Sequence, residues 1–236
     1  MSGPHEWGTA PGFVGPRHEL RERLLLDLFL SASPGPRVLD AGAGQGSMSA
    51  RLERLGFEVT STDVSPAAVE LLSGRLAGKV RQASITALPF GDASVDGAVL
   101  GEVLEHVEED REALREVARV LRPGGVLAAS VPANPALFGP SDEWAGHVRR
   151  YTRQALLDAC GAAGLSVTRC VGWGFPFSRL YHRHVYERYL DRHGPARPGG
   201  RHRPLVAAVG AILQLDRLFV GVERGALGYL LLATRP

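Results

Sequence analysis

The chain has 236 residues, of which 44% are hydrophobic, and a formal net charge of +2. A chain of this length and composition can bury the core of one α/β domain, and its nearly neutral charge gives no general reason to expect a nucleic-acid partner. Its two cysteines form no C-x-x-C pattern and have no nearby histidines in zinc-site spacing, which favours a reduced, cytoplasmic protein without a metal. The longest uncharged apolar run, residues 204–215, is too short to span a bilayer.

Residues 1–16 are rich in glycine and proline and lack the apolar run of a secretory signal, so we expect a flexible arm. Beyond the arm, apolar residues recur with the spacings of alternating helices and strands. The predicted helices cover residues 17–30, 48–55, 65–76, 109–121, 152–163 and 205–220. The predicted strands cover residues 37–40, 58–63, 79–84, 95–101, 126–131, 165–171 and 226–233. From the first strand onward the order begins βαβαβ, which predicts a doubly wound α/β sheet with right-handed crossovers.

The most informative stretch is residues 37–47, RVLDAGAGQGS, in which an apolar strand ends in Asp40 and leads into Gly42, Gly44 and Gly46. Glycine has no Cβ and tolerates positive φ, so a glycine-rich turn between a strand and a helix can bring bare backbone against a nucleotide-type cofactor. The dinucleotide pattern G-x-G-x-x-G would need glycine or alanine at position 47, where this chain has serine. The spacing therefore disfavours a nicotinamide oxidoreductase.

Asp63 stands at the end of the second predicted strand. A carboxylate at that position can accept hydrogen bonds from both ribose hydroxyls of a nucleoside, a role common to Rossmann-like sites. The alternative is that Asp63 caps the next helix, but Ser65 followed by Pro66 already supplies the expected cap. We therefore interpret Asp63 as a ligand-binding residue.

The pattern D-x-G-x-G-x-G is followed by SITALPF at residues 84–90, VLEHV at 103–107 and RVLRPGG at 119–125. These segments, in this order, resemble the motifs of the class I S-adenosylmethionine (SAM)-dependent methyltransferases, in their small-molecule branch. The resemblance covers residues 17–172 and implies a Rossmann-like, seven-stranded, mostly parallel sheet with an antiparallel last strand and helices on both faces. It also implies SAM as the cofactor and S-adenosylhomocysteine as its product.

The resemblance further implies a set of cofactor-binding residues. They are Asp40, Gly42, Gly44, Gly46, Asp63, Val64, Ser84, Ile85 and Glu102. Glu102, which follows the fourth strand, would help to hold the methionyl ammonium group. Ser84 stands where the family usually has aspartate, but a hydroxyl or backbone carbonyl can also accept the hydrogen bond of adenine N6.

The irregular stretch 132–151 is too long for an ordinary connection and resembles a segment that shapes the acceptor pocket in one branch of the family. We expect it to be a lid whose catalytic candidates are Asp142, His147 and Tyr151. His147 is the first candidate for a general base, because imidazole titrates near neutral pH.

Three further residues are candidates for contact with the substrate. Arg149 or Arg150 could neutralise an acidic substrate group, and His106 is a second candidate base. The alternatives are that His147 and Arg149 only pin the lid and that His106 packs at the start of a helix.

Residues 173–220 contain many aromatic and basic side chains and then an amphipathic helix. They could form a solvated insertion, a cover over the substrate pocket, or a surface for an anionic lipid or substrate; we favour the cover. The predicted organisation is thus the arm 1–16 and a single methyltransferase domain over residues 17–236.

The predicted function is transfer of a methyl group from SAM to a small-molecule acceptor, with oxygen favoured over carbon or nitrogen and a secondary metabolite as the expected substrate. One alternative is a macromolecular methyltransferase, but the N/D-P-P-Y/F/W motif of several such enzymes is absent at residues 101–104, which read GEVL. Another is a catalytically silent SAM-binding scaffold. We expect no nucleic-acid partner, whereas peripheral membrane contact and an anionic acceptor stay open.

Overall fold

The computed structural model describes residues 15–188 and 203–236. Most of the predicted arm and the middle of the 173–220 segment lie outside these residues. Within the described chain, no helix is both long and apolar enough to cross a membrane.

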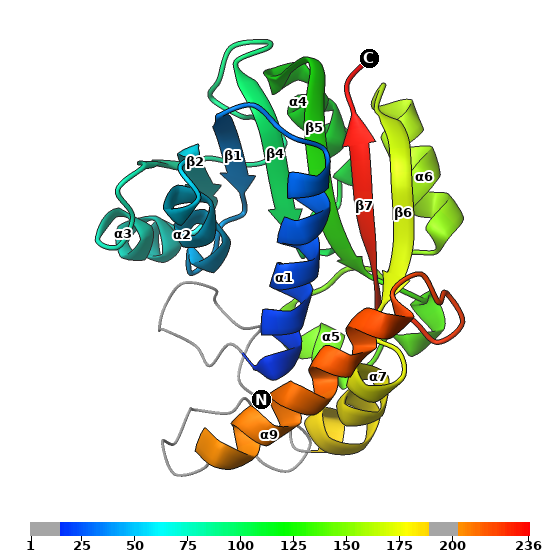
Figure 1. The fold of residues 1–236 in the computed structure, drawn as a ribbon. Coiled ribbons are helices and arrows are strands. Elements are labelled where there is room, and N and C mark those ends of the chain that lie inside the picture. Colours follow the sequence, from blue (N-terminus) through cyan, green and yellow to red (C-terminus); the bar gives the residue numbers. More distant parts are fainter. Residues whose placement is uncertain (1–14, 189–202) are drawn as a thin grey trace.

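Seven strands form a single sheet in the order β3-β2-β1-β4-β5-β7-β6. The strands are β1 (Arg37–Ala41), β2 (Glu58–Asp63), β3 (Lys79–Gln82), β4 (Val95–Gly101), β5 (Leu121–Pro132), β6 (Ser166–Trp173) and β7 (Gly228–Thr234). Strand β7 runs antiparallel to both of its neighbours, and the first five strands pair in parallel (Figure 1). The predicted fold class, with its antiparallel last strand, is confirmed.

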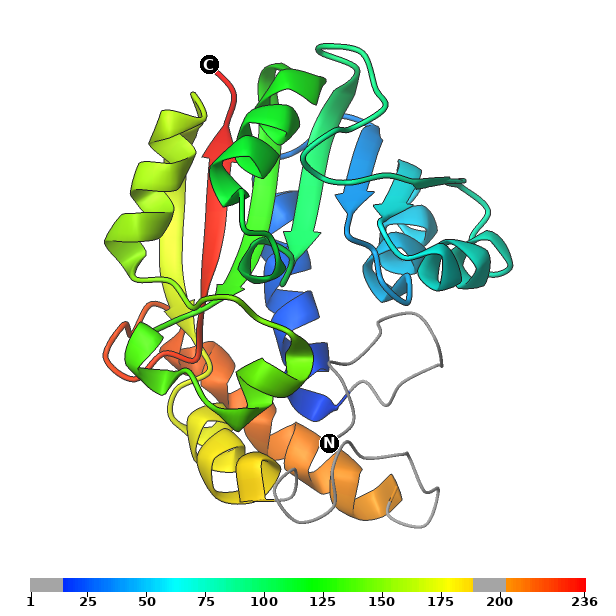
Figure 2. The ribbon, with the colours of Figure 1, turned by 180° about the vertical axis from the view of Figure 1, so that it is seen from behind.

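Helices cover both faces of this sheet. On one face lie α1 (Pro16–Ser31) and α2 (Ser47–Arg54), with α9 (Arg203–Leu213) against α1 (Figure 1). On the opposite face lie α4 (Asp110–Val120) and α6 (Arg153–Ala162), as seen in Figure 2. The helix α3 (Pro66–Ser73) packs on β2 and β3. The doubly wound arrangement therefore gives the molecule two hydrophobic cores, one on each side of the sheet.

Each core is built from the apolar stripes of its helices. Leu25, Phe29 and Leu52 fill the first core, and Leu114 and Leu156 fill the second; all five are fully buried. Burying a side chain of this size stabilises a fold by roughly 1.5–3 kcal/mol relative to leaving it exposed. The helical periodicity of the sequence is thus explained by packing against the two faces.

Two predicted helix caps form as expected. The Ser65 hydroxyl accepts a hydrogen bond from the Ala68 N–H at the start of α3, and the Thr152 hydroxyl accepts one from the Ala155 N–H at the start of α6. Several predicted boundaries differ by a few residues, and among the strands the largest difference is at β5, which begins at Leu121 rather than at residue 126. Leu121 pairs with Val95 of β4. The strand β5 therefore includes residues 122–125, which the sequence predicts to be a turn.

The segment 132–151 is a folded connection beyond the carboxyl ends of the strands. It contains a 3₁₀ turn, η2 (Pro135–Leu137), and the short helix α5 (Pro140–Ala145). Its two ends are joined, because the Asn134 N–H donates to the Tyr151 carbonyl and the Tyr151 N–H donates to the Pro132 carbonyl. The strands β1 and β4 point toward α5 (Figures 1 and 2).

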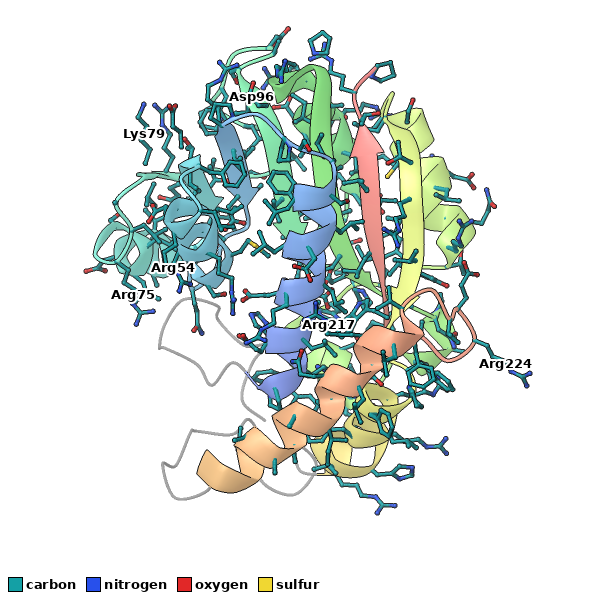
Figure 3. All side chains as sticks on the ribbon, viewed as in Figure 1. Arg54, Arg75, Lys79, Asp96, Arg217 and Arg224 are labelled. Atoms are coloured by element: carbon teal, nitrogen blue, oxygen red, sulfur yellow. The ribbon has the colours of Figure 1, made fainter. Side chains whose placement is uncertain are left out.

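The described part of the 173–220 segment is mostly helical. It comprises α7 (Phe177–Tyr181), the π-helical turn η3 (His182–Tyr186), α9 and the 3₁₀ turn η5 (Gln214–Phe219). Arg217 of η5 reaches Asp27 of α1 at 3.0 Å and ties this segment to the domain (Figure 3).

Candidate active site

The glycine turn lies at the carboxyl end of β1 and leads directly into α2. At Gly46, where φ is +79°, an added Cβ would be strained by the backbone conformation and would lie 2.5 Å from Cδ2 of Leu72, which would have to move. At Gly44, where φ is +54°, the position of a Cβ has no atom within 4 Å. The turn is therefore packed on its inner side and open at Gly44, which suits the close approach of a ligand to the backbone.

Asp63 ends β2, the strand next to β1, and reaches across to the glycine turn. Its Oδ2 accepts a hydrogen bond from the Gly44 N–H at 2.8 Å, and its Oδ1 accepts one from the Ser65 N–H at 2.9 Å. A carboxylate has about four lone-pair positions, so both oxygens keep capacity for further donors. Asp63 thus braces the turn and can still accept hydroxyl groups from a ligand.

The other residues expected near the nucleoside lie around Asp63. Val64 is 68% exposed, and the Ala83 N–H donates to the Asp63 carbonyl, which brings the start of the 84–90 segment beside Asp63. Ser84 is exposed, with its hydroxyl 2.8 Å from that of Thr86, whereas Ile85 is buried.

Asp40 faces away from this opening. Its carboxylate is buried and accepts a hydrogen bond from the Ser49 hydroxyl of α2, while burial raises its pKa to about 7. In this structure the carboxylate therefore supports the glycine turn through α2, and its contact with a cofactor stays a prediction.

Glu102 follows β4 directly and has a φ of +62°, a backbone conformation that costs on the order of 1 kcal/mol for a residue with a side chain. Its carboxylate lies 3.5 Å from Nη1 of Arg21 in α1. Burial would raise the pKa of this carboxyl, but the charges of Arg21 and His147 outweigh it and hold the pKa below its usual value. The next residue, Val103, packs against the glycine turn, since a Cβ on Gly42 would lie 2.7 Å from it.

Gly44, Asp63 and Glu102 therefore stand at the carboxyl ends of β1, β2 and β4. Ligands of open α/β sheets bind in a crevice at this edge. This set of groups fits SAM. It offers an open glycine backbone, a carboxylate for hydroxyl groups and a second carboxylate for an ammonium group.

A second group of polar residues comes from the lid. Asp142 of α5 is 1% exposed, and its Oδ1 accepts a hydrogen bond from Nδ1 of His147 at 2.7 Å. Its carboxylate also accepts from Nε of Arg150 at 2.9 Å. Burial would raise the pKa of Asp142, but His147 and Arg150 lower it. The carboxylate thus stays charged and fixes the orientation of the His147 ring.

The opposite side of His147 faces the short 3₁₀ turn η1 (Leu104–His106). Its Nε2 lies 3.9 Å from Oε1 of Glu105, and its ring meets that of His106 edge to face at 4.7 Å. Burial, with the nearby His147, lowers the pKa of His106 to about 4. Burial and the neighbouring Glu102 carboxylate raise the pKa of Glu105 well above its usual range.

Residues 39–129 match the family model of the methyltransferase domain. Residues 39–129 thus form a methyltransferase domain of the class I, SAM-dependent type. SAM is accordingly the cofactor of this domain.

Two of the curated relatives to which the chain is similar are named for quinones. The chain is 37% identical to a demethylmenaquinone methyltransferase of Renibacterium salmoninarum over 125 residues, which is 50% of this chain and 49% of the relative. It is 33% identical to a ubiquinone biosynthesis O-methyltransferase of Xanthomonas campestris over 155 residues, 62% of this chain and 64% of the relative. The matches thus span from about half to just under two thirds of the length of these relatives.

Solved structures share the methyltransferase fold at lower identity. The [4+2]-cyclase SpnF has a TM-score of 0.65 at 22% identity and covers 100% of this chain and 88% of its own. A geranyl diphosphate C-methyltransferase of Streptomyces coelicolor, solved with Mg²⁺, geranyl diphosphate and S-adenosylhomocysteine, has a TM-score of 0.62 at 18% identity and covers 92% of this chain and 79% of its own. Since one of these proteins is a cyclase by name, the fold alone does not determine the reaction.

Three lid residues are not placed where the sequence analysis expects them in this methyltransferase domain. Tyr151 is buried, and its hydroxyl donates to Oδ2 of Asp110 at 2.7 Å; burial and Asp110 raise its pKa. Arg150 is buried against Asp142. Arg149 forms ion pairs with Asp110 at 2.9 Å and with Glu108 at 3.2 Å. Tyr151 and Arg149 thus join the lid to α4, whereas Arg150 pairs with Asp142 within the lid, and the polar groups of all three are bound to other protein groups.

Glu105 has no predicted role, although it lies within the VLEHV segment. The available signal was a second acidic residue, three positions after Glu102 and directly before His106. Its burial depends on the lid, whose Val148 N–H donates to the Glu105 carbonyl at 2.8 Å.

Proposed function

We propose that the protein transfers a methyl group from SAM to an oxygen atom of a small-molecule acceptor. The observation that carries this proposal is the hydrogen bond between the buried Asp142 carboxylate and His147, whose side chain is 13% exposed, beyond the carboxyl ends of the strands. The name of the Xanthomonas campestris relative, an O-methyltransferase, supports oxygen as the accepting atom. A hydroxyl on a quinone-like ring is therefore the first acceptor class to test, and other secondary metabolites are the next.

Three residues would hold the cofactor. The backbone at Gly44 leaves room for it, Asp63 accepts hydrogen bonds from the ribose hydroxyls, and Glu102 pairs with the methionyl ammonium. When bound, SAM supplies a methyl group on a positively charged sulfur. The protein then has to align the acceptor with that methyl group and exclude water.

His147 is the residue that we assign to the acceptor hydroxyl. Because Asp142 accepts the hydrogen bond of Nδ1, the lone pair of a neutral His147 ring lies on Nε2. Asp142 is thus a positioning residue that fixes the tautomer. An acceptor hydroxyl that loses its proton at this point becomes a better nucleophile toward the methyl group.

Both cysteines are unpaired and buried, which supports the proposal of a reducing, cytoplasmic location. Helix α9 of the 173–220 segment packs against α1, and Leu213 is buried in the core on that face of the sheet, which favours a cover over a solvated insertion.

The test is incubation with isotope-labelled SAM and separate panels of phenols and quinols, amines, activated carbon acids, RNA and protein. We expect label on a phenol or quinol oxygen and at least a tenfold loss of kcat for His147→Gln. The exposed His184 gives the matched control, His184→Gln, which should keep full activity. Label in RNA or protein would favour a macromolecular methyltransferase. Binding of S-adenosylhomocysteine without transfer to any panel would favour the silent scaffold.

A further inference from the structure

Three side chains from two separate segments meet at the side of His147 that carries Nε2, the atom assigned above to the acceptor hydroxyl. One possible ligand atom from each of Glu105, His106 and His147 lies within 4.8 Å of those of the other two. Glu105 and His106 come from η1, and His147 comes from the lid. No metal site is predicted from the sequence, because His147 is distant from Glu105 and His106 in the chain and meets them only when the lid folds onto η1.

The Glu105 carboxyl group is the strongest sign that the cluster holds something. Its side chain is fully buried, and neither of its oxygens has a hydrogen-bond partner on another described residue. The facing polar atom, Nε2 of His147, stands 3.9 Å away from Oε1, too far for a hydrogen bond. A buried carboxyl group without a partner costs free energy, which a cation placed between the carboxylate and the imidazole would offset.

Both histidines are held in the way that metal ligands usually are. Nδ1 of His147 lies 2.7 Å from the Asp142 carboxylate, and Nδ1 of His106 lies 3.3 Å from the Gly146 carbonyl. A histidine that binds a metal typically donates its other N–H to a carboxylate or a backbone carbonyl, which fixes the ring and puts the lone pair on the ligating nitrogen. Asp142 and Gly146 would be these second partners.

We propose that Glu105, His106 and His147 bind one divalent transition-metal ion. Metal bonds of about 2.0–2.2 Å separate ligand atoms by roughly 3–4 Å, so the three side chains would need only small rotations to close on an ion. Two imidazoles and one carboxylate suit manganese, iron, cobalt or zinc better than magnesium or calcium, which prefer oxygen ligands. Three protein ligands leave coordination positions open for water or an acceptor oxygen.

The role of the ion rests on the proposed function. In that setting the ion would bind the acceptor hydroxyl, lower its pKa and let its proton leave to solvent, after which the oxygen attacks the methyl carbon and the sulfonium becomes a neutral thioether. His147 would then act as a ligand of the ion rather than accept the proton itself. The presence of the ion can be measured without SAM or acceptor, so failure of this inference and failure of the proposed function are distinguishable.

The test uses the full chain without a histidine tag, stripped with a chelator and titrated with Co²⁺ and Mn²⁺. We expect one equivalent of Co²⁺ to bind and produce visible absorption bands, with Mg²⁺ unable to displace it at a tenfold excess. Glu105→Gln and His147→Gln should each weaken Co²⁺ binding at least tenfold. Glu143, exposed on the same lid, and His184 supply the matched controls Glu143→Gln and His184→Gln, which should bind as the unaltered chain does.

Circular dichroism checks that each variant is folded. A second measurement needs no variant: pulsed electron paramagnetic resonance of the unaltered chain with Mn²⁺ detects nitrogen atoms bound to the ion. We expect nitrogen couplings from two imidazoles. The inference would be overturned if the chain does not bind Co²⁺ stoichiometrically, or if both site variants bind Co²⁺ as tightly as the unaltered chain does. A Mn²⁺ spectrum without imidazole coupling would also overturn it.

Discussion

Tyr151 directs its hydroxyl into the protein, where Asp110 accepts its hydrogen bond at 2.7 Å. Tyr151→Phe removes this bond but leaves Asp110 paired with Arg149. We expect the free energy of unfolding to fall by about 1–2 kcal/mol, with unchanged affinity for S-adenosylhomocysteine. Urea unfolding and calorimetry measure the two quantities. Loss of methyl transfer at unchanged stability would restore Tyr151 as a catalytic candidate.

His182 gives the structure a sensitivity to acid. It is buried in η3, where it contacts Arg17 and stacks on Tyr186, and burial followed by the charge of Arg17 lowers its pKa to about 2. Because the folded state binds the proton less readily than the unfolded state, the stability from neutral His182 is fully present above about pH 6.5 and is lost as the pH falls below that value.

The predicted contribution of His182 is a loss of about 2 kcal/mol between pH 7 and pH 5. His182→Gln should reduce the pH dependence of the unfolding free energy by about this amount, whereas the exposed His184→Gln should not. Urea unfolding at the two pH values measures the difference. An unchanged pH dependence in His182→Gln would show that its folded and unfolded pKa values do not differ.

At the scale of elements, the lid depends on Asp142. This one carboxylate accepts from Arg150, His147 and the Gly139 N–H, and so it links Gly139, which precedes α5, to two residues that follow α5. Asp142→Asn leaves the buried Arg150 without its counter-charge, which we expect to cost about 3 kcal/mol. Amide hydrogen exchange should become faster within residues 139–150 and stay unchanged in β1 and β4.

A neighbouring residue provides the control for this prediction. Glu143 is exposed on the same helix, so Glu143→Gln should leave exchange across the lid unaltered. If Asp142→Asn also leaves the exchange of residues 139–150 unaltered, the lid is held by contacts other than this carboxylate.

Local signals explain which elements could be predicted from the sequence. The glycine turn and the caps at Ser65 and Thr152 depend on a few neighbouring residues, and each one forms as predicted. The directions of Tyr151 and Arg149 depend on Asp110, which is distant in the chain and meets them only when the lid folds onto α4. Glu105 was missed for the same reason, because its environment is created by the returning lid.

At the scale of the whole molecule, the two ends of the sheet have different tasks. At the end away from the site, Asp96 at the start of β4 pairs with Arg37 of β1 at 2.9 Å and with Arg122 of β5 at 2.7 Å (Figure 3). These ion pairs tie three strands together where they begin. The glycine turn, Asp63 and Glu102 lie at the opposite end of the sheet, at the carboxyl ends of β1, β2 and β4. The order of the strands predicts that the ligand site lies at this end.

The most direct measurement is calorimetric titration of the full chain with S-adenosylhomocysteine and, as a control, a separate titration with NAD. We expect one binding site for S-adenosylhomocysteine, none for NAD, and at least a tenfold weaker affinity in Asp63→Ala, because a carboxylate that accepts ribose hydroxyls contributes about 1.5–3 kcal/mol. The exposed Asp158 of α6 supplies the control Asp158→Ala, which should bind normally. A folded chain that binds no S-adenosylhomocysteine, or that binds it equally well without the Asp63 carboxylate, would contradict the cofactor site described above.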